Sequence, residues 1–163
     1  MSGIADNAYV LKYKLAVARA RTMADPLKLA HKVRHLGDAY YYAGRGAEAE
    51  PCYVEALSIY RHHEHTPPLD LANAIRSFAV LKDYVGADDE AKPLWQEAHE
   101  LYLAVNVSAG VAESAARLAL LARRQGEAQR SLEWLAEASA AADASNDTET
   151  LEYIRKVKAQ IKE

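Results

Sequence analysis

The sequence of 163 residues contains one cysteine, Cys52. A single thiol cannot form an intrachain disulfide, and it cannot supply a thiolate metal cluster. No stretch approaches the ~18 consecutive apolar residues of a membrane-spanning helix. Asp6, Lys12 and Lys14 interrupt the first apolar residues, so the start does not have the apolar centre of a secretory signal. We therefore predict a cytoplasmic, reducing location and no membrane association.

The sequence also has little net charge and no recognisable catalytic motif. A net charge of −3 is too small to indicate a nucleic acid or an anionic membrane as the partner. A phosphate-binding glycine loop, a nucleophile elbow and an HExxH pair are all missing. We predict a protein that is not an enzyme and that needs no cofactor.

Glycine, proline and phenylalanine are scarce, with seven, five and one residues, whereas half of the chain is hydrophobic. Alanine and leucine dominate, and both favour helices. Prolines and glycines stand mostly where helical segments would join. This composition predicts an all-α globular chain rather than a β-rich or disordered one.

The pattern around residues 44–61 returns at 86–103 and again at 126–143. Gly44, Gly86 and Gly126 mark these returns, with spacings of 42 and 40 residues. A small residue follows each glycine after five positions, and a glutamate–alanine pair follows later in each stretch. A repeat of this length is one supersecondary unit that buries its apolar side only by stacking on its neighbours.

Helical periodicity divides the chain into an N-terminal helix, three helical hairpins and a last helix. The predicted segments of this single domain, residues 1–163, are 1–24, 26–63, 69–106, 108–145 and 147–163. Asp25 before Pro26 predicts a helix start, and Asp88 is a predicted N-cap. The predicted buried stripe of the first helix comprises Ile4, Ala8, Leu11, Leu15 and Ala18.

Large and small residues alternate within each hairpin in a fixed pattern. The first helices carry the pairs Leu36–Gly37, Phe78–Ala79 and Leu118–Ala119. The second helices carry Ala49, Tyr53 and Ala56, then Ala91, Trp95 and Ala98, then Ser131, Leu135 and Ala138. This pattern resembles the tetratricopeptide repeat (TPR), in the form of about 42 residues found in kinesin light chains and bacterial TPR scaffold proteins. The resemblance implies a right-handed α-solenoid of three hairpins, with an extra N-terminal helix and a C-terminal capping helix.

In the resembled family the exposed side of each first helix lines a concave groove that holds a peptide or protein segment. Mapped onto this sequence, the groove residues are His31, Arg34, His35, Asp38, Tyr41, Tyr42, Asn73, Arg76, Ser77, Tyr84, Arg117, Arg123 and Arg124. Because five of them are arginines, we expect the ligand to carry acidic residues. A family sub-class clamps a terminal carboxylate, but Asp38 and Glu113 would repel such a group here.

Two alternatives to peptide binding are open at this point. The terminal helices could serve self-association, which would make the chain an assembly scaffold and a homo-oligomer. The segment from His62 to His65 carries three histidines and a glutamate, which could hold a zinc or nickel ion in a metal-responsive domain. His31 and His35 also stand one helical turn apart, a spacing that allows shared ligation, although a binding surface is the expected role.

Overall fold

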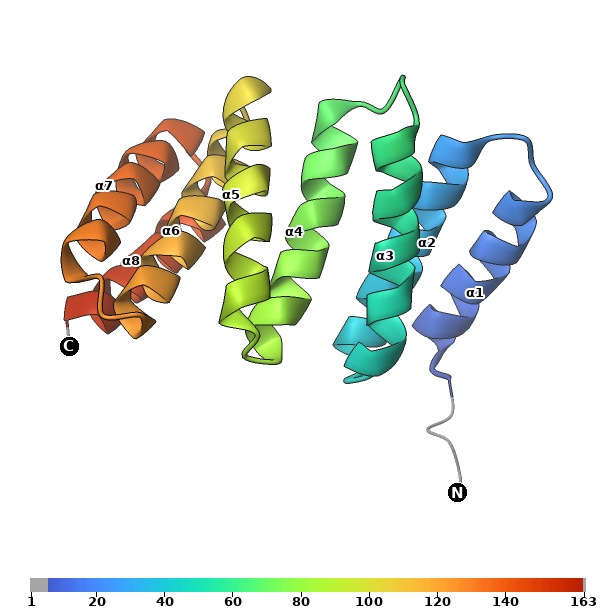
Figure 1. Cartoon of the computed structure of the whole chain (residues 1–163), viewed down its shortest axis with the longest axis horizontal. Coiled ribbons are helices and arrows are strands. Elements are labelled where there is room, and N and C mark those ends of the chain that lie inside the picture. Colours follow the sequence, from blue (N-terminus) through green and yellow to red (C-terminus); the bar gives the residue numbers. More distant parts are fainter. Residues whose placement is uncertain (1–5, 163) are drawn as a thin grey trace. The chain divides into compact units, whose positions relative to one another are not determined.

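The computed structural model describes residues 6–162, and within that range the chain forms eight α-helices and no strand. The predicted all-α fold of helical hairpins is confirmed (Figure 1). The helices are α1 (Ala8–Arg21), α2 (Pro26–Tyr42), α3 (Gly46–His62), α4 (Pro68–Tyr84), α5 (Asp88–Ala104), α6 (Ser108–Arg124), α7 (Ala128–Ser145) and α8 (Thr148–Lys162).

The helix ends follow the local chemistry of the sequence. The side chain of Asp25 accepts a hydrogen bond from the Lys28 backbone amide at 3.0 Å, and Pro26 occupies the first turn of α2. The turns inside the hairpins contain Gly44, Gly86 and Gly126, whose φ angles are 74°, 73° and 77°. Glycine adopts this left-handed conformation without steric cost, which explains its return at each turn.

By its internal packing the chain divides into two compact units, Met1–Leu81 and Lys82–Glu163, and the division falls within α4. The single domain expected for residues 1–163 stays a prediction.

In the first unit, α1 packs on α2 and α2 packs on α3. The backbones of α2 and α3 approach closely at Gly37. A Cβ atom there would lie 2.7 Å from the Tyr53 ring and 3.1 Å from Cβ of Cys52. Tyr53 is 1% exposed, and Ala49 and Ala56 on the same side of α3 are fully buried. The alternation of large and small residues therefore sets the distance between the two backbones.

The predicted buried stripe of α1 is wrong. Leu11 and Leu15 are 53% and 54% exposed, whereas the buried residues of this helix are Val10, Val17 and Ala20. At the end of this helix, Arg21 forms two hydrogen bonds to the Glu55 carboxylate of α3, at 2.7 and 2.9 Å. Ile4, the first member of the predicted stripe, lies outside the described residues.

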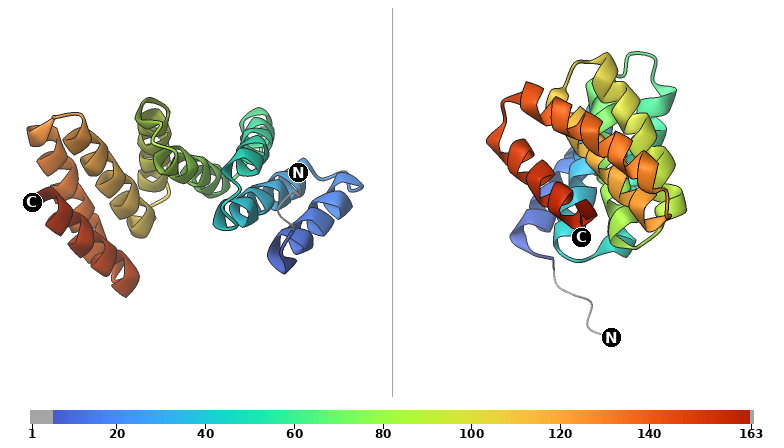
Figure 2. Two further views of the ribbon diagram at one scale, coloured as in Figure 1. Left: turned by 90° about the horizontal axis from the view of Figure 1, so that it is seen from below. Right: turned by 90° about the vertical axis from the view of Figure 1, so that its left-hand side faces the viewer.

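In the second unit, α6 packs on α5 and α7, and α8 packs on both α6 and α7. The last three helices lie together in both views of the ribbon (Figures 1 and 2). Ile154, Val157 and Ile161 bring the apolar side of α8 into this core. Within the described part of the chain, no helix has the length and apolar character needed to cross a membrane.

Lys82 is buried in the second unit, although its equivalents in the other repeats are Tyr40 and Ala122. Its ammonium group lies 2.6 Å from the carboxylate of Glu90, and 7% of the Lys82 side chain is exposed. A buried ammonium needs such a partner because the loss of water destabilises an isolated charge.

Candidate functional site

The predicted binding side of α2 contains an ordered polar network. The guanidinium of Arg34 donates to Oδ2 of Asp38 at 3.1 Å, and the hydroxyl of Tyr53 donates to Oδ1 of the same carboxylate at 2.9 Å. The side chains of Arg34 and Asp38 are 14% and 18% exposed. Asp38 therefore joins the surface of α2 to the buried ring of α3, which the sequence did not indicate.

A row of four rings lies beside this network and extends it from α2 onto α1. The ring of Tyr13 stacks on that of His35 with centroids 5.3 Å apart, and His35 meets His31 edge-on at 4.5 Å. On α1, Tyr9 meets Tyr13 edge-on at 5.0 Å. Sequence reasoning missed Tyr9 and Tyr13, although their spacing of one helical turn is a signal for a shared helix face.

The two histidines of this row have lowered pKa values. Burial is the largest cause for His35, followed by the charge of Arg34, and together with smaller effects they lower its pKa to about 4. Burial and Arg34 also lower the pKa of His31. Neutral His35 can accept the hydrogen bond from Arg34 Nη2, whose distance to His35 Nε2 is 3.1 Å. Both histidines are therefore uncharged at neutral pH.

We expect the chain to lose stability as the pH falls from about 6.5 to about 4. In that window the unfolded chain takes up a proton at His35 and the folded chain does not, so protonation stabilises the unfolded state. The lowered pKa of His31 acts in the same direction. For His35, whose ring is partly exposed, the loss should be roughly 1–2 kcal/mol. Urea unfolding at about pH 7 and about pH 4.5 measures this loss.

The control for this pH prediction is His35→Gln, which keeps a hydrogen-bond acceptor near Arg34 and removes the titrating group. Its stability should depend less on pH than that of the wild type over the same window. If both proteins lose the same amount of stability, groups other than His35 are responsible.

The remaining predicted site residues of the first unit differ in exposure. Tyr42 is 77% exposed, and its ring meets that of Tyr41 edge-on at 5.3 Å. Asn73 and Arg76 on α4 are half-buried. Ser77 is 6% exposed, so it belongs to the interior more than to the surface.

In the second unit, two predicted site arginines gather around Asp83. Arg117 Nη1 lies 3.6 Å and Arg124 Nη2 lies 3.5 Å from its carboxylate, and the Trp95 indole N–H donates to it at 2.9 Å. Burial raises the pKa of Asp83, whereas the Trp95 hydrogen bond and the two arginines oppose that rise. The guanidinium of Arg117 also lies over the rings of Trp95 and Tyr153, 5.5 and 5.6 Å from their centroids. Arg117 is therefore part of the packing of this unit.

The other predicted site residues of the second unit lie apart from this cluster. Arg123 Nη1 donates to the backbone carbonyl of Ile161 at 2.6 Å, so it contacts the end of α8. Tyr84 is 71% exposed at the end of α4. Asp88 is the first residue of α5 and does not cap it through its side chain; its carboxylate instead accepts two hydrogen bonds from Arg124, at 2.9 and 2.8 Å.

The arginines expected to attract an acidic ligand thus already contact oxygen atoms of the protein itself. This holds for Arg34, Arg117, Arg123 and Arg124. Internal carboxylates compensate much of the positive charge that the sequence suggested. The first-helix side is therefore less cationic than the sequence alone indicated.

The histidine segment after α3 contains mostly local contacts. His62 Nδ1 lies 2.7 Å from the Ser58 carbonyl, and the backbone amide of His65 donates to His63 Nδ1 at 3.2 Å. Among residues 6–162, no group of three or more His, Cys, Asp or Glu side chains has an arrangement that could hold a metal ion.

In the second unit, a histidine side chain lies within hydrogen-bond distance of both a serine and a glutamate. His99 Nδ1 lies 3.0 Å from Ser114 Oγ, and His99 Nε2 lies 2.8 Å from the Glu137 carboxylate. Ser114 is fully buried, and its hydroxyl donates to the Gly110 carbonyl at 2.7 Å. A nucleophile must reach its substrate, so this line of residues is a packing contact between α5, α6 and α7.

Comparisons with known proteins agree with the fold of helical hairpins. A family model described as tetratricopeptide repeat matches residues 33–63. A comparison of the sequence with curated proteins finds no match. Among solved structures, BtubC (BKLC) from P. vanneervenii is similar over 93% of this chain and 63% of its own, with a TM-score of 0.74 and 20% identity.

Two further solved structures share the fold. The apo form of RapI matches 93% of this chain and 57% of its own, at 16% identity and a TM-score of 0.76. A putative kinesin light chain of Podosopora anserina with TPR-like repeats matches 93% of this chain and 78% of its own, at 18% identity and a TM-score of 0.68. The chain spans less than two thirds of the length of BtubC and of RapI. The family model over residues 33–63 and the in-register returns of its pattern support an assignment of the chain to the tetratricopeptide repeat family.

Proposed function

We propose that the chain is a non-catalytic protein-interaction module that binds a peptide or protein segment on the first-helix side of its hairpins. The observation that carries the proposal is the α2 surface of the first unit. Arg34, His35 and Asp38 are held there in fixed positions, and Tyr42 is 77% exposed next to them. An exposed tyrosine beside ordered polar groups is typical of a surface that binds protein.

The physical advantage of this surface is that its polar side chains are ordered before a ligand arrives. Asp38 is fixed by Arg34 and by the hydroxyl of Tyr53, so little side-chain entropy remains to be lost on binding. His35 is neutral at pH 7, so it adds no charge to this surface. The row of rings from Tyr9 to His31 adds apolar contact area on the same side of α2.

The sharing of the fold with kinesin light chain repeats supports an interaction role. We also propose that the protein is located in the cytoplasm. Residues 1–163 are proposed to act as a single domain. The proposed ligand is a segment with hydrogen-bonding side chains and an apolar residue for Tyr42. An acidic ligand remains part of the proposal, and a strong weakening of binding by added salt would support it.

We expect a photo-crosslinking residue at position 42 to capture a protein partner from the native lysate. Tyr42 is so exposed that its replacement should leave the fold unchanged. The matched control places the same residue at position 54 on α3, where Val54 is 52% exposed. The measurement is mass spectrometry of the crosslinked peptides.

The proposal requires partners that crosslink at position 42 and not at position 54. Their capture by crosslinking at position 42 should also be lost in the full chain with Arg34→Glu, whose circular dichroism spectrum reports whether the fold is intact. Equal capture at both positions, or an undiminished yield with Arg34→Glu, would place the binding surface elsewhere.

A further inference from the structure

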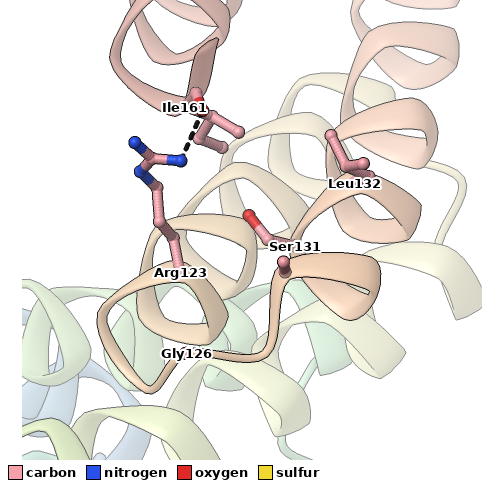
Figure 3. Close-up of a pocket in the computed structure, with 6 residues that line it drawn as sticks. Arg123, Gly126, Ser131, Leu132 and Ile161 are labelled. Carbon is pink, nitrogen blue, oxygen red and sulfur yellow. Dashed lines mark hydrogen bonds between the residues drawn. The ribbon is translucent and has the colours of Figure 1, made fainter. Parts of the chain in front are cut away.

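A pocket of about 440 Å³ lies in the second unit, where the end of α6, the start of α7 and the end of α8 meet (Figure 3). Its lining residues are Arg123, Gly126, Ala128, Ser131, Leu132 and Ile161. None of the interactions of the first unit contributes to it. Arg123 is also one of the residues mapped to the groove, so an inference about this pocket rests on the interaction function proposed above.

Arg123 is the charged residue of this lining, and its orientation is fixed. Its Nη1 donates to the Ile161 carbonyl at 2.6 Å, as the dashed line in Figure 3 shows. A guanidinium has five N–H donors in one plane, so it can bind a carboxylate while it keeps this bond. Leu132, which is 53% exposed, and Ile161 supply apolar walls.

One repeat earlier, the surface that corresponds to this pocket is formed by the end of α4 and the start of α5. There the turn between α6 and α7 occupies the space. Arg124, the last residue of α6 before that turn, donates to the Asp88 carboxylate at 2.9 and 2.8 Å and lies 3.5 Å from Asp83. Lys92 donates to the side-chain carbonyl of Gln125 at 2.8 Å. Asp83, Asp88 and Lys92 thus hold the turn of the next repeat in place. Both acids of this set contact the guanidinium of Arg124.

These three charged residues have equivalents 40 residues later, the spacing from Gly86 to Gly126. The equivalents of Asp83, Asp88 and Lys92 are Arg123, Ala128 and Leu132. An acid has become an arginine, the second acid an alanine, and the lysine a leucine. The surface that receives a cationic side chain in one repeat therefore presents a guanidinium and apolar walls in the next.

We infer that this pocket binds an acidic side chain of a protein segment, with an apolar residue next to it. The carboxylate lies on the Arg123 guanidinium, where a charge-assisted pair of hydrogen bonds forms. The neighbouring apolar side chain lies against Leu132 and Ile161. The inversion of charge at position 123 selects an anion where the preceding repeat selects a cation.

The test uses two blocked dipeptides that differ by one charge, acetyl-glutamyl-leucine amide and acetyl-glutaminyl-leucine amide. Each is titrated into the ¹⁵N-labelled full chain, and the amide signals of Gly126, Ala128 and Leu132 are followed by NMR. The acidic dipeptide should shift these signals with saturation, and the neutral one should bind about tenfold more weakly. Equal affinity of the two, or no saturating shift with the acidic one, would overturn the inference.

Three variants complete the test. Arg123→Gln should weaken binding of the acidic dipeptide about tenfold, whereas Arg130→Gln removes the same charge from α7 outside the pocket and should have little effect. Leu132→Asp keeps the bond between Arg123 and Ile161 and should weaken binding by repulsion. Binding that Arg130→Gln weakens as much as Arg123→Gln, or that Leu132→Asp leaves unchanged, would contradict a site at this pocket.

Discussion

Replacement of Trp95 by alanine should lower the free energy of unfolding by about 3–5 kcal/mol, the usual cost of removing a buried aromatic ring. Trp95 is fully buried, and its indole N–H donates to Asp83 at 2.9 Å. The variant would leave a cavity and would also remove a donor from a carboxylate that is itself largely buried. Arg117 would lose the ring face against which its guanidinium lies. Urea unfolding followed by circular dichroism measures the effect.

Trp95→Phe separates the ring from the hydrogen bond. Phenylalanine retains much of the apolar volume and removes the N–H donor, so its cost should be about 1–3 kcal/mol, below that of alanine. Equal costs for the two variants would show that the hydrogen bond to Asp83, and not the volume of the ring, dominates this position.

Gly110→Ala should destabilise the second unit by about 1–3 kcal/mol, because a Cβ atom there has no room. It would lie 2.4 Å from Cγ of the Tyr102 ring and 2.5 Å from Cδ1, well inside contact distance. Tyr102 is 2% exposed and cannot swing into solvent without opening the contact of α5 with α6. The free energy of unfolding of the single variant measures the cost.

A double-mutant cycle identifies the cause of this loss. In a Tyr102→Leu background the ring is absent, so the added methyl group of Gly110→Ala should cost much less. If the cost stays the same in both backgrounds, it arises from the backbone of α6 and not from the Tyr102 ring.

The hairpins could be predicted from the sequence because short-range patterns determine them. Gly44, Gly86 and Gly126 mark the turns, and the small residues beside large ones mark where two backbones approach. Tyr53 against Gly37 is a contact in which a large residue packs on a small one, as in this alternation. Such patterns depend on steric fit between neighbouring helices, and the sizes of the residues in the sequence indicate where that fit is possible.

The candidate site was less predictable because side-chain pairs do not follow the repeat. The sequence mapped Arg117 to an exposed face, but the guanidinium packs over Trp95 and Tyr153. Leu11 and Leu15 fit a buried stripe by spacing, yet α1 buries Val10 and Val17 instead. A terminal helix has a neighbour on fewer sides, so its periodicity alone cannot determine which of two apolar faces is covered.

The bonds of Tyr53 to Asp38 and of Trp95 to Asp83 mean that the repeats are not interchangeable parts. The aromatic residues are 42 positions apart, but the acids are not: the counterpart of Asp38 is Val80, and Asp83 lies three residues further along α4. A phenol and an indole place their polar atom at different distances from the backbone. An engineer who exchanged the two rings alone would leave a buried donor and a buried carboxylate without each other. Each aromatic residue has to be moved together with its own acid.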